Sequence, residues 1–517
     1  MSDTRASFTG DGQDRPFTGM ALWGVGLLLA FANFIALLDT TITNVSVPNI
    51  AGGLAVSPSE GTWTITSYSV AEAITVPLTG WLAQRFGTVT VFTTAMALFG
   101  LFSFACGFAP SLGLLIAFRV CQGLSGGPMI PLSQTLLIRI FPPRQAPQAM
   151  ALWGMTTVVA PILGPLLGGV LCDNVGWPWI FYINVPFAAG AAALTWRLLK
   201  PHETPGRKLP VDVVGLLLLV VWISAMQIML DKGKELDWFN SSVICVLLVV
   251  AVVGFAAFMF WELTAENPVV NMKVFRHRSF ATACVVMALA FGCFFSLNVL
   301  LPLWLQTNMN YNATWAGRTT AWGGVLAVVF SPIVGRLMGK IDSRAMVMFG
   351  ILGTASVSFM RAGFASNVDY WHIVIPQIIQ GIFVPFFFIP LMSIGTGNLP
   401  PDETASGAGL ISFVRTTAGA FGVSIMTTAW EDAGQGERVN LLNQGSGFDA
   451  AINGLSQTGA SLSRAASQIE GVLQAQAVML ATNRMFLIVG LLLTATACSI
   501  WIAPKPRFAG GPPTGGH

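Results

Sequence analysis

The chain has 517 residues, of which 54% are hydrophobic and only 9% are charged, whereas a soluble globular domain carries about 25% charged residues. The net charge of +3 at pH 7 is too small, and too scattered between apolar runs, to favour nucleic acid as a partner. Apolar runs of about 20 residues, each long enough to cross about 30 Å of hydrocarbon as a helix, recur along nearly the whole chain. The composition therefore predicts a polytopic, all-α protein of the lipid bilayer.

Fourteen membrane-spanning helices are expected from these runs. The first 19 residues are polar, so the apolar run from about Met20 is a full-length helix and not a cleaved signal. Lys and Arg concentrate in the connections on the side of the N-terminus, which by the positive-inside rule places both termini in the cytoplasm. The helices are expected to begin near residues 21, 63, 89, 112, 148, 178, 211, 241, 280, 316, 345, 372, 406 and 484.

An internal repeat at an offset of about 255 to 259 residues relates two halves of the chain. PLTGWLAQRFG at 77–87 matches PIVGRLMGKID at 332–342. RVCQG at 119–123 matches QIIQG at 377–381, and the common order of the matches argues against chance similarity between apolar helices. The predicted organisation is a cytoplasmic tail (1–20), an N-terminal six-helix half (21–200), a two-helix insertion (211–262), a C-terminal six-helix half (280–505) and a second cytoplasmic tail (506–517).

Two like halves around a central cleft are the usual architecture of secondary transporters, in which one half rocks against the other. The chain contains no G-x-x-x-x-G-K-[ST] phosphate loop, so transport is expected to run on an ion gradient without a cofactor. The four histidines lie in loops or at chain ends, and H-E-x-x-H and G-x-S-x-G are missing from the sequence. These features disfavour a metal site and an intramembrane enzyme or receptor.

Asp39, in the stretch FIALLDTTITNVSVPNI, places a carboxylate within an apolar run. Asp39 in the first expected helix and Arg119 in the fourth lie at similar depths, about 10 to 12 Å below the outer surface at 1.5 Å per residue. An ionisable side chain on a membrane helix costs at least about 2.5 kcal/mol and normally faces the interior of the bundle. The two residues are expected to meet, either as a proton-coupling pair or as a structural ion pair that locks their helices.

Glu72 lies about one turn deeper, near the middle of the second expected helix, with Ala, Val and Ile around it. Such surroundings favour the neutral acid, which suits a group that must load and release a proton. Asp39 beside Arg119 is expected to stay charged, so that the arginine expels the proton in one conformation and withdraws in the other. The alternative is a Glu72 that a hydrogen bond holds permanently protonated.

Arg415 lies near the middle of the thirteenth expected helix, and no acid occurs within any span of the second half. Its partner is expected to be a backbone carbonyl, a substrate group or a first-half acid across the cleft. Aromatic and Met residues either line an apolar, adaptable pocket for hydrophobic or amphipathic compounds or face lipid. The candidates for the substrate cavity are Asn44, Trp153, Met155, Phe291, Phe295, Phe386 and Arg415.

Several segments resemble motifs of the major facilitator superfamily, specifically of the fourteen-span drug:proton antiporters of the QacA and EmrB type, and above all of the EmrB subgroup. LDTTITNVSVP at 38–48 resembles the motif of helix 1, and RVCQGLSGG at 119–127 that of helix 4. APILGPLLGG at 160–169 is similar to the antiporter motif of helix 5. The resemblance implies proton coupling through Asp39 and Arg119. It also implies gating or motif roles, with plain helix packing as the alternative for the glycines, for Gly80, Arg85, Gly87, Gln122, Gly123, Gly164, Pro165, Gly168 and Gly169.

The segment after the second expected helix departs from the superfamily pattern. Its usual acid is replaced by Gln84, and the basic residues expected after Gly87 are Thr88, Val89 and Thr90. This departure puts in doubt a cytoplasmic gate that relies on such a charge network.

The sequence thus predicts a proton-coupled multidrug efflux antiporter of the bacterial inner membrane, with a proton-coupled importer of small metabolites as the alternative. One proton moving down 100 mV releases about 2.3 kcal/mol, enough for roughly fifty-fold accumulation of a neutral solute. The resemblance to EmrB-type pumps implies a periplasmic adaptor protein and an outer-membrane channel as partners. The long outer loop at 431–483, rich in Gln, Ser, Gly and Ala, is expected to form a polar, partly helical cap. It is the docking candidate or, alternatively, a mobile loop without a partner.

Overall fold

The computed structural model describes residues 17–142, 145–204, 206, 210–338, 340–365, 368–397, 399–400, 402–444 and 461–504. These residues form helices joined by short connections. The helices are α1 (Gly19–Gly53), α2 (Pro58–Gly61), α3 (Trp63–Phe86), α4 (Thr88–Gly107), α5 (Leu112–Gly126), α6 (Met129–Ile140), α7 (Ala146–Asn174), α8 (Trp179–Tyr182), α9 (Asn184–Leu199), α10 (Val213–Lys232), α11 (Ser242–Thr264), α12 (Arg278–Asn308), α13 (Ala313–Leu337), α14 (Ser343–Arg361), α15 (Tyr370–Thr396), α16 (Thr404–Gln444) and α18 (Leu462–Ser499), with 3-10 turns η1 (Lys200–His202), η2 (Trp238–Asn240), η3 (Met272–Arg276) and η4 (Ile500–Ile502).

Within the described residues, twelve helical stretches are long and apolar enough to cross a membrane, and the bent helix α7 raises the number to 13. The chain is therefore an all-helical, multi-span membrane protein. Helix α3 has the length of a span, 24 residues, but Glu72 and several Ser and Thr side chains make it too polar to count with the others. The expected total of fourteen spans therefore depends on α3.

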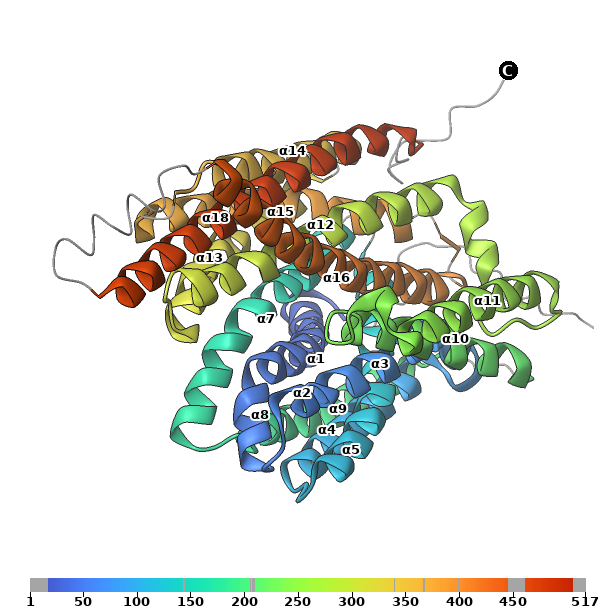
Figure 1. The fold of residues 1–517 in the computed structure, drawn as a ribbon. Helices are drawn as coiled ribbons and strands as arrows, with labels where there is room; N and C mark the ends of the chain where they lie inside the picture. The colour runs from blue at the N-terminus through green and yellow to red at the C-terminus, as the bar shows by residue number, and fades with distance from the viewer. Residues whose placement is uncertain are drawn as a thin grey trace, which may run out of the picture.

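The two related halves lie against each other, and the insertion packs along one of the seams between them. In Figure 1 the first half (α1–α9, blue to teal) lies below the second half (α12–α18, yellow to red), with the green pair α10 and α11 at their side. Helix α10 packs against α3 of the first half and α16 of the second. Trp222 of α10 meets the ring of Phe413 of α16 at a centroid distance of 5.9 Å, and Lys232 Nζ donates to Thr62 Oγ1 at 2.6 Å. The insertion therefore bridges both halves and covers the seam between α3 and α16.

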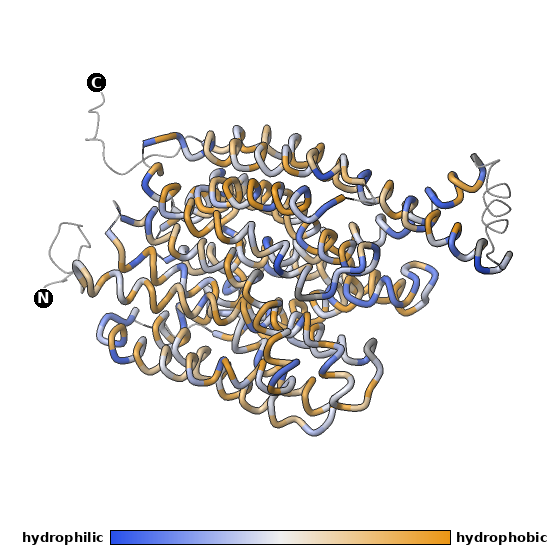
Figure 2. Tube along the Cα trace, turned by 90° about the vertical axis from the view of Figure 1, so that its left-hand side faces the viewer, coloured by the Kyte–Doolittle hydropathy of each residue, from blue (hydrophilic) through white to orange (hydrophobic). Residues whose placement is uncertain are grey.

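The start of α1 and the end of α18 lie at the same end of the bundle (Figure 2). We call this end the terminal face and the opposite end the loop face. Helices α16 and α18 continue past the loop face as a projecting pair (Figure 2), joined by an Arg438 Nη2 to Glu470 Oε1 ion pair of 2.6 Å. The outer segment at 431–483, expected to be partly helical, is helical over 431–444 and 462–483, while 445–460 lie outside the described residues.

Near the terminal face the two halves are in close contact. A Cβ atom added to Gly80 of α3 would lie 2.6 Å from the Cα of Ser406 in α16, and one added to Gly335 of α13 would lie 3.2 Å from the carbonyl oxygen of Pro147 in α7. Near the loop face, by contrast, a cavity of about 190 Å³ lies between α1, α7 and α13, with Pro165 and Gly317 in its lining. The halves are therefore tightly packed at the terminal face, and at the loop face a small cavity lies beside the contact between Pro165 and Gly317.

Close helix contact also holds the second half together, where α12 crosses α16. A Cβ atom added to Gly422 would lie 2.3 Å from the carbonyl oxygen of Gly292. We expect Gly422→Ala to lower the thermal unfolding midpoint in detergent micelles, because overpacking costs about 1–3 kcal/mol and backbone cannot move aside as a side chain can. Gly190→Ala in α9, where nothing lies within 4 Å, is the control. Equal midpoints for the two variants would contradict this account of the crossing.

Candidate functional site

The structure brings Asp39 and Arg119 together in the core of the first half. Asp39 on α1 is 1% exposed and Arg119 on α5 is fully buried. Arg119 Nη1 lies 2.7 Å from Asp39 Oδ2. Asp39 Oδ1 accepts two further hydrogen bonds, from Gln122 Nε2 at 3.1 Å and Asn184 Nδ2 at 2.7 Å. The two oxygens of this carboxylate therefore accept from three donors, one of them a guanidinium, and charge-assisted hydrogen bonds of this kind are strong.

Arg119 also ties this carboxylate to α3. Its Nε donates to the carbonyl oxygen of Thr64 at 3.0 Å, and its Cζ lies 4.2 Å from the centre of the Tyr68 ring. A cation this close to an aromatic face is attracted to the π electrons, most strongly where water is excluded. One guanidinium therefore connects α1, α3 and α5, and a movement of α3 against α1 must change its contacts.

Glu72 lies on α3 and faces the second half. Its side chain is half-buried, and among the described residues its carboxylate has no hydrogen-bond partner. Helix α3 packs against α16, which carries Arg415, and the positive charge of Arg415 acts on the Glu72 carboxylate across the junction of the halves. Three partners for Arg415 were possible from the sequence: a backbone carbonyl, a substrate group or a first-half acid. The interaction with Glu72 favours the first-half acid. The hydrogen bond that would hold Glu72 permanently protonated does not occur in this conformation of the described chain.

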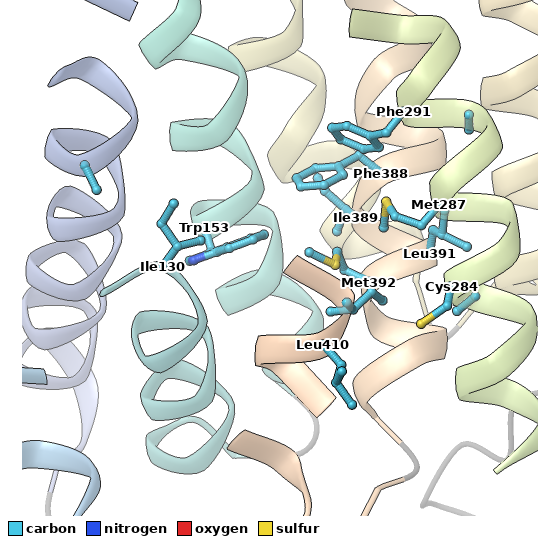
Figure 3. Packing of buried hydrophobic residues seen from close by; sticks show 14 of the residues in the cluster. Ile130, Trp153, Cys284, Met287, Phe291, Phe388, Ile389, Leu391, Met392 and Leu410 are labelled. Atoms are coloured by element: carbon cyan, nitrogen blue, oxygen red, sulfur yellow. The ribbon is translucent and has the colours of Figure 1, made fainter. Parts of the chain in front are cut away.

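Arg415 lies among aromatic rings contributed by both halves. It is 2% exposed, and its Cζ lies 5.9 Å from the ring of Trp153 and 5.8 Å from the ring of Phe291. The Trp153 ring on α7 stacks on that of Phe388 on α15 at 5.8 Å, and Phe388 lies 5.1 Å from Phe291 on α12. Figure 3 shows these three rings at the junction of the halves, with the sulfur atoms of Met287 and Met392 nearby. This aromatic cluster (Trp153, Phe291 and Phe388) offers an apolar, polarisable surface beside a buried cation.

The other cavity candidates are distributed differently. Phe295 lies 5.6 Å from Phe291 and extends the aromatic cluster. Phe386 instead contacts Phe349 at 5.2 Å, and the side chain of Phe349 is 51% exposed on the outside of the bundle. Asn44 on α1 is exposed and Met155 on α7 is half-buried, and neither belongs to the cluster.

The motif glycines mark places where helices approach closely. Gly123 of α5 faces the Tyr68 carbonyl oxygen, which would lie 2.5 Å from an added Cβ, and Gly168 of α7 faces that of Ile42 at 3.2 Å. Gly164 packs on Thr41, whereas Gly169 has no neighbour within 4 Å. The remaining motif residues are placed as follows: Gly80 at the contact between the halves, Arg85 over the Trp81 ring at 5.1 Å, Gly87 between α3 and α4 with φ +92°, Gln122 on Asp39 and Pro165 at the cavity near the loop face.

A neutral amide and an acid from another segment replace the expected charges after α3. Gln84 Nε2 donates to the carbonyl oxygen of Asp402 in the second half at 3.1 Å. Glu203, which follows α9, accepts hydrogen bonds from the backbone N–H groups of Val89 and Thr90 at the start of α4, at 2.9 and 2.7 Å. Burial raises the pKa of Glu203, but hydrogen bonds from Thr90, Val89 and Thr204 outweigh it and leave this pKa below its ordinary value. An acid from another segment thus stabilises the first turn of α4.

Two members of the site were missed by sequence reasoning. Asn184 is 1% exposed and donates to Asp39, and the Tyr68 ring lies against Arg119. The available signal for Asn184 was its place in WPWIFYINVP, a segment with an amide among aromatic and apolar residues. Tyr68 carried no such signal, because an aromatic residue in a membrane helix is ordinary.

Comparison with known proteins identifies the family. The model of the Major Facilitator Superfamily matches residues 29–423. The chain is 42% identical over 510 residues to "Multidrug export protein EmrB" of Escherichia coli (strain K12), covering 98% of this chain and 100% of the relative. It is 41% identical over 506 residues to "Fatty acid resistance protein FarB" of Neisseria gonorrhoeae, covering 97% and 99%.

A solved structure of the proton:xylose symporter XylE shares the fold, with a TM-score of 0.59 at 13% identity over 94% of this chain and 97% of that one. Together with the family model and the near full-length relatives, this likeness confirms the resemblance seen in the motifs. The chain belongs to the major facilitator superfamily and, within it, to the EmrB-like subgroup.

Proposed function

We propose that the protein is a proton-coupled multidrug exporter that exchanges hydrophobic or amphipathic compounds for protons and needs no cofactor. The names of its relatives, multidrug export protein and fatty acid resistance protein, support export of such compounds. The observation that carries the proton-coupled part is the buried Asp39–Arg119 pair of 2.7 Å, together with Glu72 facing Arg415 across the junction of the halves.

In the proposed cycle the two acids have different tasks. Asp39 is ionised while Arg119 is close, and it accepts a proton when movement of α3 withdraws the arginine. Glu72 has no hydrogen bond of its own, so its charge is balanced mainly by Arg415 of the other half. Protonation of Glu72 removes an attraction between the halves and favours their separation, since opposite charges in a low-dielectric site attract strongly.

The proposed substrate site is the aromatic cluster beside Arg415. Rings from both halves contribute to it, so a bound apolar compound contacts both halves at once and biases their relative position. Phe386 is not part of this site, because its contacts lead toward the outside of the bundle.

We further propose that α3 is the fourteenth span and that both termini are cytoplasmic in a bacterial inner membrane. In that orientation the close contacts at the terminal face shut the structure toward the cytoplasm. The projecting pair formed by α16 and α18 would then enter the periplasm, where we place the contact with an adaptor protein and, through it, an outer-membrane channel.

The test is expression in a drug-sensitive Gram-negative cell that lacks its own pumps. An exporter gives resistance, and an importer of small metabolites gives uptake instead. In inside-out vesicles, addition of drug should release protons with the wild-type protein. If Asp39→Asn, Glu72→Gln and Arg119→Ala all retained this exchange, the assignment of the proton site would be wrong.

A further inference from the structure

The second half contains a buried arginine that the transport mechanism does not use. Arg361, the last residue of α14, is fully buried. Its Nη2 donates to Gln380 Oε1 on α15, and its Cζ lies 5.9 Å from the Phe486 ring on α18. Its Nε and Nη1 and the Nε2 of Gln380 are buried without a hydrogen-bond partner. Three unfilled donors therefore belong to two side chains in direct contact.

No carboxylate of the neighbouring helices balances this cation. The sequences of α12, α13, α14 and α15 contain no Asp or Glu, and the one acid of α18, Glu470, is exposed and paired with Arg438. Asp369, in the connection before α15, is exposed and paired with His372. The C-terminal end of α14 and the face of Phe486 each offset a part of the desolvation of the guanidinium. Neither accepts a hydrogen bond from Nε or Nη1 of Arg361. Buried donors in proteins are nearly always paired.

The first half shows what normally completes such a set of donors. Gln380 corresponds to Gln122 through the repeat of QIIQG and RVCQG, and Gln122 Nε2 donates to the Asp39 carboxylate. NVLLP at 298–302 matches NVSVP at 44–48. Asp39 precedes its proline by nine residues (48 − 39), and at the same distance before Pro302 stands Cys293 (302 − 293). The second half thus keeps the amide donor but has Cys293 where the first half has its acceptor and Gln377 where it has Arg119, and its buried cation, Arg361, comes from α14 instead.

We propose that a small inorganic anion of the chloride class binds between Arg361 and Gln380. It accepts hydrogen bonds from Arg361 Nε and Nη1 and from Gln380 Nε2, the donors that are vacant in the described chain. A neutral water molecule supplies an acceptor but no charge, whereas an anion also neutralises the guanidinium in its low-dielectric surroundings. The anion would fix α14, α15 and α18 to one another, and unlike Asp39 it would not titrate.

The experiment uses the full-length protein purified in detergent, with sodium chloride replaced stepwise by sodium gluconate at constant ionic strength. We expect chloride to raise the thermal unfolding midpoint by about 2 °C in a saturable manner, because a ligand that binds only the folded state stabilises it. Bromide should act in the same way, and gluconate, a bulky organic anion, should have no effect. Equal midpoints in chloride and gluconate at every concentration would show that the site holds only water and overturn the proposal.

Arg361→Gln removes the cation and should abolish the chloride response. The control is Arg438→Gln, which removes an exposed arginine of the projecting pair and should leave the response intact. Persistence of the full response in Arg361→Gln would also overturn the proposal. If that variant does not fold, line broadening of the ³⁵Cl resonance by the wild-type protein, reversed by bromide, decides the matter, since no broadening means no bound anion.

Discussion

Replacement of Asp39 by asparagine should abolish drug-induced proton release from inside-out vesicles and lower the thermal stability of the protein. The variant leaves Arg119 buried at 0% exposure without its counter-charge, and removal of one partner from a buried ion pair costs about 3–5 kcal/mol. In the wild-type protein Gln122 and Asn184 donate to the Asp39 carboxylate. The asparagine offers these two donors either its NH₂ group or a weaker acceptor oxygen. Proton release is followed with a pH-sensitive dye and stability by the unfolding midpoint in detergent.

A second variant separates proton coupling from a merely structural ion pair. Asp39→Asn combined with Arg119→Gln removes both charges, so it should recover much of the stability that the single variant loses. A proton-coupling role predicts that the double variant still fails to exchange protons for drug. A stable double variant that transports with normal coupling would show that the pair only locks α1 to α5.

The positions of the helices could be predicted from the sequence because each helix that contacts lipid and the protein core must be apolar along its length. The first thirteen expected helices begin within three residues of helices in the structure, as 112 for α5 and 316 for α13 (Ala313–Leu337) illustrate. The last expectation, 484, is wrong by 22 residues, since α18 begins at Leu462. Its first turns lie outside the apolar part of the helix, where the Ser461 cap and the Arg438–Glu470 pair replace hydrophobic burial.

The sequence predicts which site residues meet when their depth in the membrane determines the contact. It does not predict contacts that depend on which way a side chain points around its helix axis. Asp39 and Arg119 were expected to meet because both lie at one depth in a membrane that tolerates no isolated charge, and they do. Phe386 was expected in the cavity, but Phe388, two residues on and about 200° around the helix, occupies the aromatic cluster instead. Apolar residues surround the whole of α15, so no hydrophobic stripe reveals which side faces the cleft.

Gly80→Ala should reduce transport about fivefold or more without unfolding the protein. In the present conformation a Cβ atom on residue 80 would lie 2.6 Å from the Cα of Ser406, so α3 and α16 must move apart at the terminal face. Overpacking of this kind costs about 1–3 kcal/mol. The cost applies only to the conformation that is closed at the terminal face. It lowers the population of that conformation about 5- to 150-fold relative to the other conformation.

The penalty of Gly80→Ala applies only when the terminal face is closed, which distinguishes it from a general loss of stability. Drug-induced proton release should fall, and the distance between spin labels at 84 and 402, positions that are in contact across the halves, should lengthen. Gly190→Ala in α9 is the control, because nothing lies within 4 Å of the added atom and the residue belongs to none of the motifs, and it should change neither quantity. Wild-type transport by Gly80→Ala would mean that the halves need not close at this contact, and the gating role of the α3–α16 seam would have to be abandoned.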